Sequence, residues 1–201
     1  MAPSIEAIIK EYPYGPEGVQ RIAHRRVKNE IEITEPDPSW PKTFQLLKDR
    51  IVSALGSTVV SVEHVGSTSV PGLPAKPVID IDLTVVDVLD EASYVPQLEA
   101  VGFHFLLREP AWHEHRFFCN YEPSANLHVF GPDCPEAEKH KIFRNWLSKT
   151  TTDKEMYAAM KREAAEASRK AGETMNEYTE RKNECIREIL GRAFRDLGYI
   201  Q

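Results

Sequence analysis

The sequence predicts an α/β (α+β) protein in which a small mixed β-sheet is flanked by helices and followed by a C-terminal helical pair. Runs rich in β-branched and aromatic residues, bounded by Gly and Pro, recur between residues 59 and 130 and indicate strands. Apolar residues at steps of three and four surround these runs, as in amphipathic helices that pack on a sheet. After residue 150 the helical period continues in a strongly charged composition, which favours helices beside the sheet.

The chain is long enough for one domain with an appended part. Its 201 residues suit a single core. We expect residues 1–35 to form an N-terminal arm and residues 36–201 to form the domain, with 152–197 as its helical part. The arm contains a turn-rich stretch around Pro13 and a basic cluster from His24 to Lys28. A surface arm packed on the domain and a phosphate-binding arm both remain open.

The first helix of the domain has clear end signals. Ser39 is an N-cap candidate, Pro41 is tolerated in the first turn, and Gly56 suits the position just after the helix. Between them an apolar stripe would pack on the sheet. The later pattern predicts strands at 59–65, 77–86, 103–107, 115–121 and 126–130, and helices at 91–101, 135–148, 153–170 and 173–196.

The bulk composition narrows the class of protein. The formal charge of −6 disfavours nucleic-acid binding, and no apolar run is long enough to span a membrane. Three separated cysteines without a CxxC pattern indicate reduced thiols, and the N-terminus lacks the pattern of a secretory signal. We therefore expect a cytoplasmic protein.

The triplet Asp80-Ile81-Asp82 is the strongest chemical feature of the chain. Residues two apart in a strand point to the same face, about 6.5–7 Å apart, so both carboxylates project together. Such a pair can share Mg²⁺ (or Mn²⁺), which takes oxygen ligands and leaves room for substrate phosphates. We assign Asp80 and Asp82 as candidate metal ligands and catalytic residues. An Asp-x-Asp on an exposed strand face is the alternative.

A second set of candidates could hold phosphate. Gly66 and Ser67 form a turn before the acids, where a glycine lets the backbone approach an anion closely. Thr68 adds a hydroxyl and Lys76 a cation. Lys182 falls on the inward stripe of its helix, so it either extends outward along its stem or faces a buried anion. The run Lys161-Arg162-Glu163 is interpreted as a solvated helix face.

Histidines and one arginine are candidates for the lining of the same cleft. His115, Arg116 and His128 lie on predicted neighbouring strands, with Arg116 expected on a phosphate or carboxylate. A transition-metal cluster is one alternative, and histidines hydrogen-bonded within a polar sheet face are the other. His64 precedes the Gly-Ser turn and is expected to brace it at the cleft.

These residues carry a family resemblance. The stretch HVGSTSVPGLPAKPVIDIDL, from His64 to Leu83, resembles the signature of the GrpB-like family of the nucleotidyltransferase superfamily. Weaker similarity extends to Asp37–Trp40, to Leu127–Gly131 and to Tyr178 with Lys182. The resemblance implies the DNA polymerase β-like nucleotidyltransferase fold, with Gly66 and Ser67 at a triphosphate and the two acids on magnesium.

The sequence departs from the superfamily pattern in one respect. Active members bring a third carboxylate from a later strand, whereas the later strands here offer Asn126 and His128. Glu63 and Glu114 are the substitutes to consider. Three hypotheses follow. The protein transfers a nucleotidyl group to a small acceptor, or it is an inactive module that binds a nucleotide or another phosphorylated ligand, or it is a structural domain. Its oligomeric state is left open.

Overall fold

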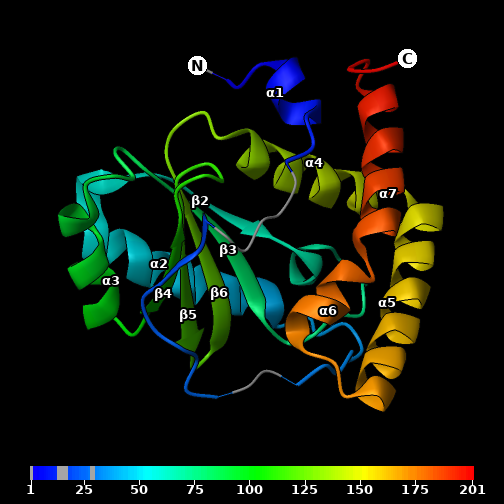
Figure 1. Cartoon of the computed structure of the whole chain (residues 1–201), viewed down its shortest axis with the longest axis horizontal. Helices are drawn as coiled ribbons and strands as arrows, with labels where there is room; N and C mark the ends of the chain where they lie inside the picture. The colour runs from blue at the N-terminus through cyan, green and yellow to red at the C-terminus, as the bar shows by residue number, and fades with distance from the viewer. Residues whose placement is uncertain (1, 13–17, 28–29) are drawn as a thin grey trace.

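The computed structural model describes residues 2–12, 18–27 and 30–201, and a mixed β-sheet lies at its centre (Figure 1). In this part of the chain six strands are ordered β1-β4-β5-β6-β3-β2. Among these strands the pair β3 and β6 is parallel, and the other neighbouring pairs are antiparallel. The strands are β1 (Gln20–Arg21), β2 (Val59–Val65), β3 (Ile79–Val85), β4 (His104–Glu109), β5 (His115–Tyr121) and β6 (Ser124–Phe130).

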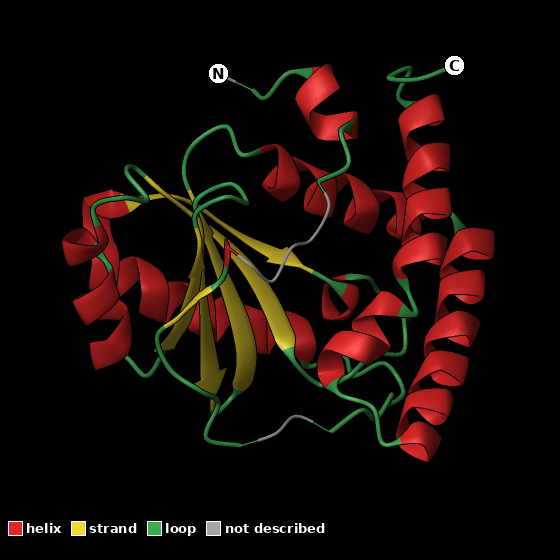
Figure 2. Cartoon of the chain, in the orientation of Figure 1, coloured by secondary structure: helices red, strands yellow, loops and turns green. Residues whose placement is uncertain are grey.

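Two helices cover one face of the sheet. These are α2 (Trp40–Leu55) and the short α3 (Val95–Ala100), which follows a 3₁₀ turn at Glu91–Ser93 (Figure 2). The apolar stripe of α2 packs on the β3 residues that alternate with the two acids, so Leu47, Ile51, Ile81 and Leu83 are fully buried in one cluster. Burial of each such side chain stabilises the fold by about 1.5–3 kcal/mol. The main core therefore fixes which face of β3 carries Asp80 and Asp82.

A helical layer lies beside the sheet on the β2 side (Figure 1). It comprises α1 (Ile5–Ile9), α4 (Pro135–Lys149), α5 (Thr151–Ala171), α6 (Met175–Glu180) and α7 (Asn183–Asp196). The single helix predicted at 173–196 is wrong, because the chain turns between α6 and α7. Tyr178 packs with Ala164 and Ala165 of α5, whereas Ile189 belongs to a different cluster with Leu147. The turn between α6 and α7 lets the two helices pack into different apolar clusters.

The N-terminal segment adds to the edge of the sheet and then crosses toward α5 and α6. The backbone amides of Ile22 and Ala23 donate to Leu106 of β4, next to the β1 pairing. Further along, Ile31 and Ile33 pack against the cluster around Tyr178. The predicted turn at Pro13 and the end of the basic cluster, Lys28, lie outside the described residues.

The prediction of a mixed α/β fold is confirmed. The predicted strands 59–65 and 115–121 match β2 and β5 residue for residue, and the other three predicted strands differ only at their ends. Within the described ranges, none of the helices has the length and apolarity needed to cross a membrane. The division into an arm at 1–35 and a domain at 36–201 stays a prediction.

Candidate functional site

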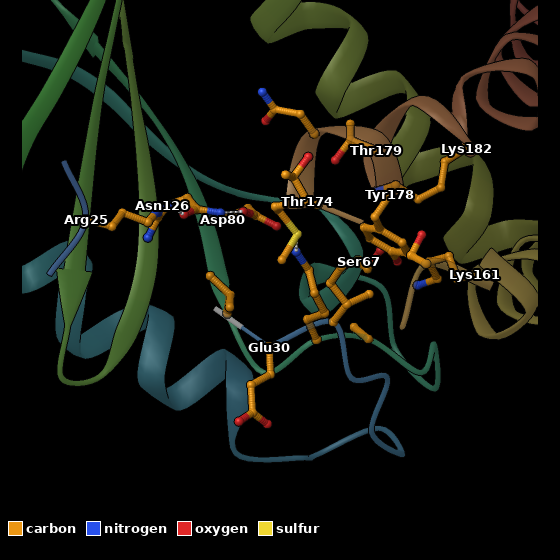
Figure 3. A pocket seen from close by; sticks show the side chains of 18 of the residues that line it. Arg25, Glu30, Ser67, Asp80, Asn126, Lys161, Thr174, Tyr178, Thr179 and Lys182 are labelled. Carbon is orange, nitrogen blue, oxygen red and sulfur yellow. Dashed lines mark hydrogen bonds between the residues drawn. The ribbon is translucent and has the colours of Figure 1, made fainter. Parts of the chain in front are cut away.

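A cavity of about 1430 Å³ lies on the face of the sheet opposite α2. Its walls come from the ends of β3 and β6, the turn after β2, helices α5 and α6, and the N-terminal segment (Figure 3). The sequence candidates Gly66, Ser67, Thr68, Lys76, Asp80, His128 and Lys182 all line it. Residues from distant parts of the chain therefore meet at the Asp-x-Asp strand.

Asp80 lies at the centre of the cavity. Its Oδ1 accepts a hydrogen bond from Nδ2 of Asn126, which pairs with it on the neighbouring strand β6, at 2.7 Å. Burial raises the pKa of Asp80, while Asn126 and the charge of Lys76 oppose that rise. The carboxylate is thus oriented by an amide and desolvated without an ion pair among the described residues.

The turn at Gly66 packs directly on this carboxylate. Gly66 has φ +67°, and a Cβ atom there would lie 2.3 Å from Oδ2 of Asp80. The residue must therefore be glycine for both its conformation and its close approach to the acid. The 3₁₀ turn Ser67–Ser69 follows, so the backbone of the predicted phosphate turn borders Asp80.

Thr68 and His64 brace this turn. The Thr68 hydroxyl donates to the carbonyl of Val78 at 3.3 Å and bonds Nε2 of His64 at 3.0 Å. Its hydrogen-bonding capacity is largely used inside the protein, although the residue borders the cavity. The ring of His64 stacks on Phe44 of α2, with centroids 4.7 Å apart, and lies outside the cavity lining. The expectation that His64 braces the turn fits this geometry, but its assignment to the cleft does not.

Asp82 is held by a residue that the sequence did not suggest. Its Oδ2 contacts Nδ1 of His140, from α4, at 2.8 Å. Burial alone would lower the pKa of His140, but the charge of Asp82 and this hydrogen bond raise it to about 9. The other oxygen of Asp82, Oδ1, is buried without a hydrogen-bond partner in the described part of the protein. An orphaned buried carboxylate oxygen is costly, so it marks a place for a cation or a proton donor.

Three lysines line the side of the cavity formed by α5 and α6. Burial lowers the pKa of Lys161 to about 7 and that of Lys182 to about 8, and it lowers the pKa of Lys76 as well. The ammonium groups of Lys76 and Lys182 both lie over the ring of Tyr178, at 5.4 and 4.5 Å from its centroid. Within the described residues none of the three forms an ion pair. They form a cationic cluster that we call the lysine wall.

Lys161 corrects the interpretation of its charge run as a solvated face. Its side chain is only 2% exposed, and Nζ donates to the carbonyl of Pro74 at 2.6 Å. The signal was present in the sequence, because Lys161 follows Tyr157 by four residues and precedes Ala164 by three. That spacing places it on the buried stripe of α5.

A chain of hydrogen bonds leads from the sheet to the cavity through two histidines. Oε2 of Glu109 contacts Nδ1 of His115 at 2.7 Å, and Nε2 of His115 contacts Nδ1 of His128 at 3.0 Å. Burial lowers the pKa of both histidines to about 3, so each ring carries one proton at neutral pH. If the carboxylate of Glu109 accepts from Nδ1–H of His115, then Nε2 of His115 accepts from Nδ1–H of His128. The relay therefore leaves Nε2 of His128 with a free lone pair.

His115 and Arg116 cannot both face the cavity, because neighbours on a strand point to opposite faces. His115 lies behind His128 and reaches the cavity only through it. Arg116 lies on the helix-covered face, where its Nε donates to Glu91 at 2.9 Å and its Nη1 bonds Glu114. The expectation that Arg116 lines the cleft and contacts a phosphate is corrected by this placement.

The two substitutes for a third carboxylate are also committed elsewhere. Glu114 pairs with Arg116, and Glu63 pairs with Arg144 of α4 at 3.0 Å. On β6, the strand beside the acids, Asn126 and His128 lie in register with Asp80 and Asp82. Uncharged side chains therefore occupy the positions beside the acid pair on this strand.

The donor set fits a divalent cation that arrives with a ligand. Among the described residues, no group of three or more His, Cys, Asp and Glu side chains is arranged to hold a metal alone. Asp80 and Asp82 nevertheless offer oxygen atoms, and Oδ1 of Asp82 has no partner there. Mg²⁺ is commonly held by one or two carboxylates together with substrate phosphates. The site thus suits Mg²⁺ when phosphate oxygens complete the coordination.

The comparison with known families agrees with the geometry. A family model described as GrpB protein matches residues 30–192. The chain belongs to the GrpB family. It is therefore a nucleotidyltransferase-like protein, as its Gly-Ser turn and Asp-x-Asp strand predict. The predicted family resemblance is confirmed.

Individual relatives show how far the similarity extends. A UPF0157 protein of Halalkalibacterium halodurans is 45% identical, over 81% of this chain and 82% of its own length. The crystal structure of the conserved protein GrpB from Enterococcus faecalis matches with a TM-score of 0.70 at 24% identity, covering 83% of this chain and 99% of that one, which shows the shared fold. A protein named dephospho-CoA kinase from Mycolicibacterium paratuberculosis is 28% identical over 82% of this chain and 46% of its own length.

Replacement of Gly66 by alanine tests the close contact with Asp80. Gly72 is the matched control, since it has φ +74° and a Cβ atom added there would meet nothing within 4 Å. We expect Gly72→Ala to lower the free energy of unfolding by about 1 kcal/mol, for the left-handed backbone alone. Gly66→Ala should cost about 1–3 kcal/mol more because the methyl group overlaps the carboxylate. Urea unfolding measures both, and equal losses would contradict the close contact.

The histidine relay predicts the tautomer of His128. At pH 8 the ring should carry its proton on Nδ1, which long-range ¹H–¹⁵N NMR of the imidazole nitrogens detects. His115→Phe keeps an aromatic ring against Phe130 but removes the acceptor, so His128 should shift toward the Nε2–H form. His104→Phe is the control, since His104 bonds Tyr121 instead. A parent protein with its proton on Nε2 of His128 would overturn the relay.

Proposed function

We propose that this GrpB-family protein binds a nucleoside triphosphate together with Mg²⁺ (or Mn²⁺) in the cavity over Asp80 and Asp82. One observation carries the proposal: the lysine wall and Asp80 line the same cavity without an ion pair between them in the described structure, and Asp82 lies buried behind it on the same face of β3. Buried charges of both signs that leave each other unpaired are costly unless a ligand compensates them. A magnesium-phosphate complex presents both complementary charges at once.

Each residue would then have a distinct part in binding. Gly66 and Ser67 would let phosphate oxygens approach the backbone, and Lys76, Lys161 and Lys182 would balance their charge. Asp80 and Asp82 would hold the cation, which neutralises charge on the phosphoryl oxygens. His140, kept protonated by Asp82, would either add a further positive charge to the pocket or release Asp82 to the cation.

Nucleotidyl transfer is the enzymatic form of the proposal. The oxygen of an acceptor hydroxyl would bond to the α-phosphorus of the triphosphate. The bond between the α-phosphorus and the pyrophosphate leaving group would break, and the hydroxyl proton would pass to a base. Positioning and electrostatic stabilisation supply most of the rate in such reactions. His128 offers the free Nε2 lone pair beside the acids, although its low pKa makes it a weak base.

A binding module without transfer is the second candidate. The observation that favours it is the pair Asn126 and His128, which stand beside the acids where β6 brings no carboxylate. Such a protein would keep the phosphate turn and the cation site and lack an efficient base. The relatives named dephospho-CoA kinase make dephospho-coenzyme A a further ligand to test.

Calorimetric titration tests the binding proposal. We expect ATP, CTP, GTP, UTP or dephospho-coenzyme A to bind more tightly with Mg²⁺ than without it. Asp82→Asn should remove the effect of Mg²⁺, and Lys182→Gln should weaken binding about tenfold, the loss of about 1.4 kcal/mol. Lys170→Gln is the control, because Lys170 is exposed and pairs with Glu166 on α5. The proposal fails if none of these ligands binds in any condition.

The same titrations should reveal proton uptake. Burial holds the pKa of Lys161 near 7 and that of Lys182 near 8, and a bound phosphate would raise both values. At pH 8 binding must therefore take up protons, and affinity should fall as the pH rises above about 7. The binding enthalpy is measured in buffers of different ionisation enthalpy, and its dependence on the buffer gives the number of protons taken up. Proton release in titrations without Mg²⁺, where no cation displaces His140 from Asp82, would contradict the lysine wall as the phosphate site.

Pyrophosphate release separates the two candidates. The bound triphosphate is incubated with a mixture of hydroxyl-bearing metabolites, and pyrophosphate and label transfer from the α-phosphate are followed. Pyrophosphate release together with label transfer, both abolished by Asp82→Asn, would establish nucleotidyl transfer. Tight, magnesium-dependent binding without any pyrophosphate would support the binding module.

A further inference from the structure

The cavity has a second cationic end, on the other side of Asp80 from the lysine wall. Arg25 and Asn126 lie on one side of Asp80, whereas Lys161, Tyr178 and Lys182 lie on the other (Figure 3). Arg21 and His24, from the same segment as Arg25, also line the cavity. The cavity volume of about 1430 Å³ also exceeds the roughly 300–1,000 Å³ typical of pockets for one small molecule. The space suits two ligands side by side.

Arg25 is built into this end. Its Nη2 donates to Oδ1 of Asn126 at 2.5 Å, and the guanidinium lies over the ring of Phe117, 5.5 Å from its centroid. A guanidinium has five N–H donors and stays charged at any physiological pH. In the described part of the chain Arg25 has no carboxylate partner, so its remaining donors can bind an anion.

Asn126 connects Arg25 to the acid pair. Its Oδ1 accepts from Arg25, which fixes the amide so that Nδ2 donates to Oδ1 of Asp80. An anion bound by Arg25 would therefore be separated from Asp80 by the side chain of Asn126. That is the position in which an acceptor would have to lie if a nucleotide occupied the lysine wall.

The segment that carries Arg25 lies outside the family match. The GrpB family model matches residues 30–192, whereas the segment from Gly18 to Val27, which we call the strap, precedes it. The strap is held by β1 and by the amides of Ile22 and Ala23 on Leu106. It adds a wall to the cavity that the matched region does not supply.

We infer that Arg25 and the strap form a second anion subsite, which binds a phosphate or carboxylate group of the acceptor molecule. Its assignment to an acceptor rests on the proposed function, with the nucleotide on the lysine wall. Phosphate and carboxylate share the bidentate geometry that a guanidinium recognises. Arg25 is a binding residue of this subsite.

NMR titration of the full chain tests the subsite with simple anions. Inorganic phosphate and acetate are titrated separately into the protein with and without saturating Mg-ATP. We expect the side-chain amide of Asn126 and the Nε–H of Arg25 to shift along a saturable curve in both states. Tighter binding of one anion identifies the group that the subsite prefers. The amide of Gly66 reports the nucleotide in the same spectra.

Matched variants decide the role of Arg25. Arg25→Gln should weaken the anion response about tenfold and leave the affinity for Mg-ATP within about twofold. Arg26→Gln is the control, since Arg26 is exposed, lies over Tyr121 and does not line the cavity. Arg25→Lys should restore part of the response. Unchanged spectra of the core amides show that each variant is folded.

Two results would overturn the inference. One is the lack of a saturable response at Asn126 in the parent protein. The other is an equal loss of Mg-ATP affinity in Arg25→Gln and Lys182→Gln, which would place Arg25 on the nucleotide itself. Failure of the proposed function looks different, because Mg-ATP would then leave Gly66 unshifted. The anion titration without nucleotide would still report whether Arg25 binds.

Discussion

The contact between Gly66 and the carboxylate of Asp80 is the constraint on which the site depends. It joins the turn after β2 to the start of β3 at a distance that no other residue permits. The turn can pass so close because β2 and β3 are antiparallel neighbours and Val65 is in register with Asp80. The alternation of β3 then sends Ile79 and Ile81 into the core under α2. Packing of the core and placement of the acids on the opposite face of the sheet are thus two consequences of one strand register.

Charge is the second organising feature. The core stabilises the fold by removing apolar surface from water, whereas the cavity holds desolvated charges at a cost. Asp80 has an amide partner and Asp82 a protonated histidine, yet the lysines facing them have no carboxylate partner in the described residues. The lowered pKa values of Lys161 and Lys182 express this cost. A fold tolerates such an arrangement where ligand binding offsets it.

The sequence predicted the parts of the site that are local in the chain. Twelve residues separate Ser67 of the Gly-Ser turn from Asp80, so the chemistry of both could be inferred from spacing and strand alternation. The place of Lys182 on a helical stripe indicates its inward position, although the same stripe does not predict the break between α6 and α7. Strand alternation applied to β5 would also have separated His115 from Arg116. The lining of the cavity by Lys182 agrees with the sequence prediction, and its role as a phosphate ligand stays a prediction.

Other parts could not be predicted, because they depend on how distant segments dock. His140 reaches Asp82 from a helix 58 residues away, and nothing in the local pattern of α4 distinguishes it from a surface histidine. Arg25 reaches Asn126 across 101 residues, and the basic cluster that contains it does not indicate this contact. Long-range contacts of this kind are set by the tertiary fold and leave no periodic signal in either segment.

This division has a consequence for what the motif can determine. The turn and the acid pair supply the features expected of any magnesium-phosphate complex, and they belong to the region that the GrpB family model covers. The lysine wall comes from α5, from the turn between α6 and α7 and from the loop before β3, and the strap precedes the matched region. These outer segments, rather than the motif, bound most of the space around a ligand. Under the proposed function, the identity of that ligand would therefore be determined by α5, α6 and the strap, while the motif would account only for its phosphate.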